Sequence, residues 1–188
     1  MNHVFLGGSR KVSRLTDPIR ERLQEIVQRK MHIIIGDANG ADKAMQRQLA
    51  EWGYPNVVVY FVGLQPRNNE GDWPTYHVAT PPRARGFDFY SVKDRVMAEA
   101  AECGFMLWDG ESRGTLANVE RLAEVSKPVA VYFSPGRRFI NVLSSSDIGR
   151  LLSEKAFAPA PNNSTSGDLQ TALELPERTH RRKQRRTA

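Results

Sequence analysis

The sequence predicts one α/β domain, a Rossmann-like three-layer sandwich with a mostly parallel sheet of about five or more strands. Short apolar runs alternate with segments of helical periodicity as far as residue 133, which is typical of strand–helix repeats. The run at 57–62 is apolar and rich in β-branched residues, as expected for a strand buried on both faces of a parallel sheet. A chain of 188 residues suffices for one such domain with a substantial core.

The first part of the chain contains three predicted strands and two predicted helices in alternation. The strands are expected at residues 4–6, 31–35 and 57–62. Asp17 followed by Pro18 is a favourable start for the first helix. The second helix follows the turn at 36–42, and Gly53 and Pro55 end it.

Residues 64–90 interrupt the alternation with prolines, glycines and aromatic side chains. A segment of this length inside a compact domain is typical of a lid or binding loop. The alternative is a proline-rich excursion that packs its own aromatic side chains or closes a dimer, and we expect a homo-oligomer on that ground. Arg67, Arg83 and Arg85 would suit an anionic ligand or a partner subunit, and Trp73 is a candidate for stacking on a base.

The later elements restore the pattern. Ser91 is expected to cap a third helix, and a fourth helix follows the turn at 109–115. Further strands are predicted at residues 105–108 and 129–133. Beyond Gly136 the pattern weakens, and Asp147 is expected to cap a last helix.

The predicted domain covers residues 1–157, and residues 158–188 form a basic tail that we expect to be disordered in isolation. Residues 176–188 alone carry five of the six net positive charges, so the body of the protein is nearly neutral. The tail arginines could bind nucleic acid through its phosphate charge, or they could form an ordinary solvated terminus.

Several classes of protein are disfavoured by composition. No apolar run approaches the roughly 18 residues that would cross a bilayer, and no signal peptide is evident, so we expect a cytoplasmic protein without a membrane partner. Cys103 is the single cysteine and the four histidines lack ligand spacing. We therefore predict no disulfide, no metal site and no certain cofactor beyond a nucleotide-type ligand.

Three glycine-containing turns follow the first, second and fourth predicted strands. Right-handed crossovers place such turns together at the carboxyl ends of the strands, where open α/β sheets bind ligands. Backbone amides at the helix starts would favour phosphate there. The candidate ligand-binding residues are Gly7, Gly8, Ser9, Arg10, Gly36, Asp37, Asn39, Gly40, Asp42, Lys93, Asp109, Gly110, Ser112, Gly114, Thr115 and Asn118.

The acidic residues among these candidates leave alternatives open. Asp42 could cap the second helix or accept a ribose hydroxyl. Asp37 should face a sugar hydroxyl, a base amine or water, since a carboxylate facing phosphate is unfavourable, and it is the one weak catalytic candidate. Lys93, expected at a helix start, has the wrong sign for the helix dipole and could face a phosphate or be a surface lysine. Each turn alone could be an ordinary strand-to-helix connection.

These turns resemble those of the SLOG superfamily, above all its YspA-like branch. The segments 7–10, 36–42 and 114–115 follow the family's Gly-Gly-x-Arg, Gly-x-Ala-x-Gly-Ala-Asp and Gly-Thr turns in order, within about residues 3–133. Lys93-Asp94 stands where the family has Arg-Asn. A more distant similarity extends to the lonely-guy phosphoribohydrolases and to DNA-processing protein A.

The resemblance implies a Rossmann-like protein that binds a nucleotide or a nucleotide derivative, and our first hypothesis is that it acts as a sensor. Lonely-guy relatives cleave N-glycosidic bonds with a glutamate, but Asn118 stands at that position here and cannot act as a carboxylate base. An N-glycosidic hydrolase or transferase is therefore the alternative, with Asp37 or Asp109 in that role. The second alternative, by analogy with DNA-processing relatives, is nucleic-acid binding through the basic tail.

Overall fold

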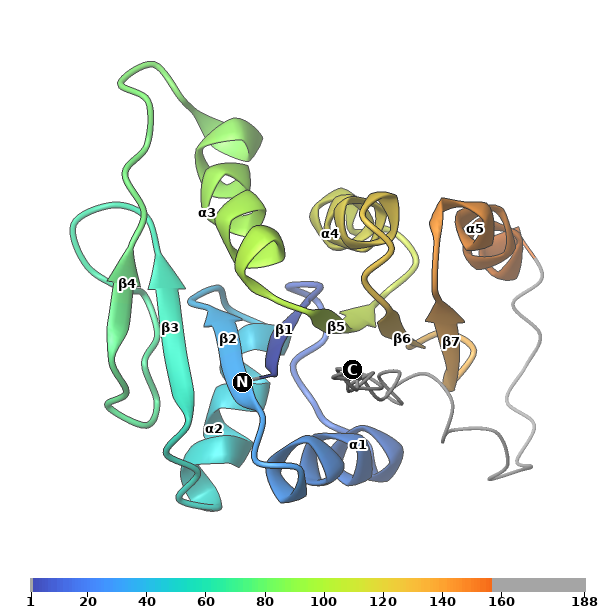
Figure 1. The fold of residues 1–188 in the computed structure, drawn as a ribbon, viewed down its shortest axis with the longest axis horizontal. Coiled ribbons are helices and arrows are strands. Elements are labelled where there is room, and N and C mark those ends of the chain that lie inside the picture. Colours follow the sequence, from blue (N-terminus) through green and yellow to red (C-terminus); the bar gives the residue numbers. More distant parts are fainter. Residues whose placement is uncertain (1, 157–188) are drawn as a thin grey trace, which may run out of the picture.

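The structure is a computed structural model that describes residues 2–156. A seven-stranded sheet lies between two layers of helices (Figure 1). Helices α1 (Asp17–Gln28) and α2 (Ala41–Glu51) cover one face. Helices α3 (Gly86–Ala100), α4 (Arg113–Glu124) and α5 (Ile148–Ala156) cover the other. The predicted Rossmann-like three-layer α/β sandwich is confirmed.

The sheet has the order β4-β3-β2-β1-β5-β6-β7, and all neighbours are parallel except β6 and β7. The strands are β1 (His3–Gly8), β2 (His32–Gly36), β3 (Val57–Phe61), β4 (Thr75–His77), β5 (Cys103–Trp108), β6 (Val129–Phe133) and β7 (Arg138–Val142). The order runs one way from β1 to β4 and the other way from β5 to β7. The carboxyl ends of β1 and β5 therefore form the switch point at which such sheets bind ligands.

Two apolar cores, one on each face of the sheet, hold the layers together. Leu6, Ile35 and Leu107 point toward α1 and α2, whereas Phe5, Ile34 and Met106 point toward α3 and α4. This alternation of neighbouring residues is the period of two that a strand imposes. Strands β5 and β6 are buried along their whole lengths, so both faces of the central sheet are covered.

The start of α3 differs from the prediction. The helix begins at Gly86, so Ser91 lies inside it and donates its hydroxyl hydrogen to the carbonyl oxygen of Asp88 instead of capping the first turn. Lys93 is consequently well inside the helix, and the argument from the helix dipole does not apply to it. The nearby prolines and glycine made residues 81–90 resemble a loop, but the prolines end before the helix begins.

Other differences concern the edges of the sheet and the helix caps. Strands β4 and β7 were not predicted, because β4 has only three residues and β7 follows a region of weak periodicity. Thr16 and not Asp17 is the N-cap of α1. Asp147 ends a 3₁₀ turn, Ser145–Asp147, and forms a capping box with Ser144. Residue 157 and the tail at 158–188 lie outside the described residues.

Within residues 2–156 no helix is both long enough and apolar enough to cross a membrane.

Candidate functional site

A cleft of about 660 Å³ opens at the switch point of the sheet. Residues of the turns after β1, β2 and β5 line it, and so do residues of α3. Of the predicted ligand-binding residues, the cleft is lined by Gly7, Gly8, Arg10, Gly36, Asp42, Lys93, Asp109, Ser112, Gly114, Thr115 and Asn118. Those absent from the lining are Ser9, Asp37, Asn39, Gly40 and Gly110. The topology thus brings the three predicted turns together.

Two glycines allow the turns to pack directly on one another. A Cβ at Gly8 would lie 2.5 Å from the carbonyl oxygen of Leu107 and 2.7 Å from the Cβ of Ala41. Gly40 has a φ of 86°, and a Cβ there would collide with the backbone of Arg10. Side chains are therefore excluded at both positions by close backbone approach.

Ser9 joins the β1 and β5 turns from beneath the cleft. It is fully buried, and its hydroxyl donates to Asp109 Oδ1 at 3.0 Å and lies 3.3 Å from the hydroxyl of Thr115. Asp109 Oδ1 also accepts the amides of Glu111 (2.9 Å) and Ser112 (2.7 Å). Burial would raise the pKa of Asp109, but these hydrogen bonds outweigh it and hold the pKa below its usual value.

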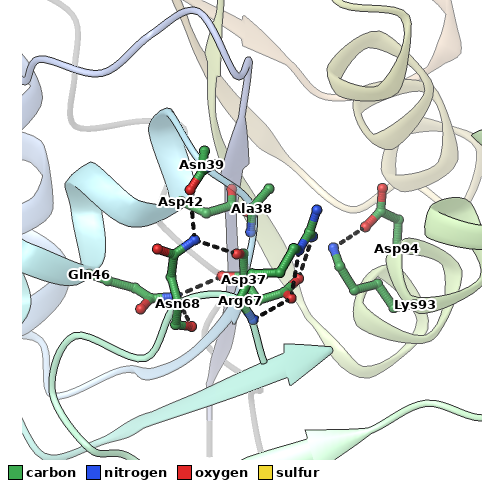
Figure 2. Close-up of polar contacts among 10 residues, drawn as sticks. Asp37, Ala38, Asn39, Asp42, Gln46, Arg67, Asn68, Lys93 and Asp94 are labelled. Carbon is green, nitrogen blue, oxygen red and sulfur yellow. Dashed lines mark hydrogen bonds and ion pairs between the residues drawn. The ribbon is translucent and has the colours of Figure 1, made fainter. Parts of the chain in front are cut away.

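The carboxylate of Asp37 forms an ion pair with Arg67. Its side chain is fully buried, with Oδ1 2.6 Å from Arg67 Nη2 and Oδ2 2.9 Å from Arg67 Nε (Figure 2). Oδ2 also accepts the backbone amide of Arg67 at 3.1 Å. Burial alone would raise the pKa of Asp37, but the hydrogen bonds and charge of Arg67 hold it below its usual value. A carboxylate engaged on both oxygens orients a guanidinium and has little capacity left for a ligand.

The segment that carries Arg67 is anchored to the β2 turn by amide side chains. Asn68 Nδ2 donates to the carbonyl oxygen of Asp37 at 2.8 Å and to Asn39 Oδ1 at 3.0 Å (Figure 2). Gln46 Nε2 donates to the carbonyl oxygen of Gly36 at 2.8 Å, and Gln46 Oε1 accepts a hydrogen bond from the backbone amide of Glu70. This part of the predicted lid or binding loop therefore forms a fixed wall of the cleft.

The ring of Tyr90 contacts two guanidinium groups at the mouth of the cleft. The guanidinium carbon of Arg67 lies 4.7 Å from the centroid of the Tyr90 ring, and that of Arg10 lies 5.2 Å from it. The Arg67 side chain remains 34% exposed, and Arg10 is exposed. An anion entering the mouth would meet both groups.

The floor of the cleft is a buried charge cluster of Asp42, Lys93 and Asp94. Lys93 Nζ lies 2.7 Å from Asp94 Oδ1 (Figure 2), and burial, which would lower its pKa, is outweighed by Asp94 and Asp42, so that the pKa is raised. Burial raises the pKa of Asp42 to about 6, although the charge of Lys93 opposes the rise. A Cβ at Gly36 would collide with both Asp42 and Lys93, so this glycine makes room for the cluster.

Asn118 extends this cluster toward α4. Its Nδ2 lies 3.4 Å from Asp94 Oδ2, and its Oδ1 accepts a hydrogen bond of 2.7 Å from Arg121. The cleft therefore combines cationic groups at its mouth with carboxylates and an amide at its floor. Such a set can bind a ligand that has an anionic end and a hydrogen-bond-donating end.

Several lining residues were missing from the predicted site. Phe87, Tyr90 and Asp94 of α3 line the cleft, and so does Arg67, which the sequence suggests only as suited to an anionic ligand or a partner subunit. The spacing of positions 87, 90 and 94 is helical and would have indicated one face of α3 if the helix had been predicted to start at residue 86. Which residues lie opposite them across the cleft is decided by tertiary packing alone.

Three further residues of the 64–90 segment lie outside the cleft. Trp73 is buried in the core below α2, with its indole N–H donating to the carbonyl oxygen of Tyr54 at 2.8 Å, so it cannot stack on a ligand in the cleft. Arg83 and Arg85 are exposed and do not line the cleft. Within residues 2–156 no group of three or more metal-ligating side chains occurs.

The comparisons with known proteins concern the fold. No family model and no curated protein matches the sequence. The structure is similar to that of DNA processing protein A from Helicobacter pylori, a protein that binds single-stranded DNA. The TM-score is 0.54 at 16% sequence identity, over 85% of this chain and 74% of that chain. At this identity the similarity establishes a shared fold.

Proposed function

We propose that the protein binds a nucleotide or a nucleotide derivative in the cleft at the switch point. The observation that carries this proposal is the chemical division of the cleft. Arg10 and Arg67 are suited to phosphate, Phe87 offers aromatic surface to a base, and Asp42 and Asp94 can accept hydrogen bonds from sugar hydroxyls or a base amine. The volume of about 660 Å³ lies in the range typical of small-ligand sites.

Binding without turnover, as in a sensor, agrees best with the state of the carboxylates. Asp37 is engaged by Arg67 on both oxygens, and Asp109 Oδ1 accepts three hydrogen bonds from its own surroundings. Asp37 is therefore not free to attack or to accept a proton from water. Asp109 lines the cleft, but its pKa is held below the usual value by its hydrogen bonds, which makes it a weak base for an N-glycosidic hydrolase.

The test is titration calorimetry of the purified protein against common ribonucleotides, combined with mass spectrometry of small molecules released on denaturation. We expect saturable binding of at least one nucleotide, weakened in an Arg10→Ala variant and unchanged in Arg47→Ala. Arg47 is a matched control because its Nε forms an ion pair with Glu70 outside the cleft. Failure of every nucleotide to bind, together with an empty purified protein, would contradict the proposal. Release of free base from a bound nucleotide would favour the hydrolase.

Single-stranded nucleic-acid binding is the second candidate. The shared fold with a protein that binds single-stranded DNA favours it, and so does the excess of arginine in residues 176–188. Binding through such a tail should weaken steeply with salt, because each neutralised phosphate releases counterions. Fluorescence anisotropy with a labelled oligonucleotide should show binding by the full chain and its loss on deletion of 176–188. Undiminished binding by the shortened protein would refute a role for the tail.

We further infer that the chain is a SLOG protein of the YspA-like type. The order of the three turns supports this, and so does their convergence on one cleft. An alignment of homologues in which Gly40, Asp42 and Thr115 vary freely would count against it.

A further inference from the structure

The cationic side chains around the cleft differ in how far their charges are already balanced. Lys93 is paired with Asp94 at 2.7 Å, and Lys11 is paired with Glu111 at 2.6 Å. Arg67 is bound from behind by Asp37, which leaves its outer edge toward the cleft. Arg10 contacts the Tyr90 ring, and within residues 2–156 no carboxylate forms an ion pair with it. The least balanced positive charge therefore lies at Arg10, beside the guanidinium of Arg67.

Four backbone amides of the glycine turns donate hydrogen bonds to the chain itself. Ala41 N donates to the carbonyl oxygen of Ser9 at 3.2 Å, and Ala38 N donates to Asp42 Oδ2 at 3.1 Å. At the start of α4, Thr115 N donates to Ser112 Oγ at 3.3 Å, while Ser112 N donates to Asp109. The hydroxyl of Thr115 is also bonded to Ser112, at 3.0 Å. A phosphate bound by these four amides would have to displace internal acceptors, and two of those acceptors are carboxylates.

The floor of the cleft is also unfavourable for phosphate. Lys93 is only 4% exposed and shares the floor with the carboxylates of Asp42 and Asp94, and Asp109 lines the wall. Above a pH of about 6 this floor carries more negative than positive charge, because Asp42 is then ionised. Repulsion would place an anionic group away from the floor, whereas hydroxyl and amine donors would be attracted to it.

We propose that Arg10 and Arg67, held on the ring of Tyr90, form the phosphate site of the cleft, and that the glycine turns do not. The ligand class is a nucleoside phosphate bound with its sugar toward Asp42 and Asp94 and its phosphate at the mouth. Asp37 is then a positioning residue that presents the Arg67 guanidinium. This inference rests on the proposed function, because it assigns the orientation of a nucleotide in the same cleft.

The orientation can be measured as the ratio between the affinity for a nucleoside 5′-monophosphate and that for the corresponding nucleoside. The probes are adenosine, guanosine, cytidine and uridine, each with and without the 5′-phosphate. Loss of one hydrogen-bonded guanidinium should lower the ratio about 10- to 100-fold. The variant Arg10→Ala tests the site directly, since Arg10 is exposed and forms no ion pair with a buried carboxylate among residues 2–156. Arg47→Ala is the control and should leave the ratio unchanged.

Two further variants test the second guanidinium group and the α4 turn separately. Asp37→Asn combined with Arg67→Gln replaces the buried pair by neutral amides and removes the second guanidinium without leaving a lone charge. Gly114→Ala probes the α4 turn, where an added Cβ would find only ordinary contact, 3.9 Å from Phe87. Loss of the ratio in both arginine variants supports the proposal.

Three outcomes would overturn the proposal, each for a different reason. A ratio retained in Arg10→Ala and lost in Gly114→Ala would move the phosphate to the α4 turn. A wild-type ratio near one would remove the phosphate site but leave nucleoside recognition in the cleft. Absence of binding by every probe would overturn the proposed function itself.

Discussion

Asp37 illustrates how a residue chosen for its chemistry acquires a different role from its neighbours. A carboxylate directly after a buried strand is a reasonable catalytic candidate from sequence. In the structure it is fully buried and takes three hydrogen bonds from Arg67, two from the side chain and one from the backbone. The hydrogen-bonding capacity of its carboxylate is used to orient Arg67, which lies 30 residues further along the chain.

Replacing Arg67 by Ala should destabilise the protein by about 3–5 kcal/mol, because it leaves the Asp37 carboxylate buried and unpaired. Chemical denaturation at neutral pH measures the change. Arg47→Ala should cost at most about 1 kcal/mol, since the guanidinium of Arg47 is largely exposed. Equal losses of unfolding free energy in the two variants would show that the buried Asp37–Arg67 pair stabilises the protein no more than the exposed pair does.

Asp42 should give the protein a recognisable pH dependence. Its folded-state pKa is about 6, above the ordinary 3.8, so the folded protein binds this proton more tightly than the unfolded chain does. The contribution of Asp42 to the free energy of unfolding therefore falls as the pH rises from 3.8 to about 6. Above a pH of about 6, the folded protein bears the full cost of burying the ionised carboxylate. About 1.4 kcal/mol per pKa unit gives a change of roughly 3 kcal/mol.

The measurement compares wild type with Asp42→Asn by denaturation between pH 4 and pH 7. The variant should gain stability relative to wild type as pH rises, with most of the gain complete near the pKa of Asp42. Curves that stay parallel over this range would mean that Lys93 compensates the charge of Asp42 fully.

At the scale of elements, the site depends on turns whose backbones touch. The β1 turn and the start of α2 meet at Gly40, and the β1 and β5 turns meet at Gly8 and Ser9. Helix α3 contributes its first turns to the same cleft, from Gly86 to Asp94. Its residues at positions 87, 90 and 94 share one face because they follow the helical repeat.

Gly40→Ala should destabilise the protein by more than Gly53→Ala does. Both glycines have positive φ values, 86° and 62°, so both substitutions carry a cost for left-handed backbone. Only at Gly40 would the added Cβ also collide with the backbone of Arg10, whereas nothing lies within 4 Å at Gly53. Thermal or chemical unfolding of the two variants measures this difference, and equal losses would contradict close packing of the turns.

At the scale of the whole molecule, the cleft and the basic tail are separate sources of affinity. All residues that line the cleft lie between Phe5 and Asn118, and the excess positive charge lies in 176–188. We therefore expect deletion of 176–188 to leave nucleotide affinity unchanged within about twofold while it removes salt-dependent oligonucleotide binding. Parallel titrations of both ligands against the full and shortened chains test this, and a joint loss would mean that the tail contributes to the cleft.

The sequence predicted more of the fold than of the site, for an identifiable reason. Long apolar or strongly periodic segments, such as 57–62 and 113–124, reveal their structure locally. Short or marginal elements such as β4 and β7 form because a neighbouring strand offers them hydrogen bonds. The beginning of α3 was obscured by the prolines before it, and with it Phe87 and Tyr90 were lost from the predicted site.

The sequence by itself determined the alternation of strands and helices and the position of three glycine turns at one edge of the sheet, because periodicity and crossover handedness are local rules. Tertiary structure alone decided which polar groups remain available to a ligand. Asp37 and Ser9 became internal partners, while Arg67 and Asp94 joined the cleft, since hydrogen bonds between residues 30 to 106 positions apart form only when the chain is folded. A polar side chain that is hydrogen-bonded within the protein is no longer available to a ligand, and the packing of the fold decides which side chains are bonded in this way.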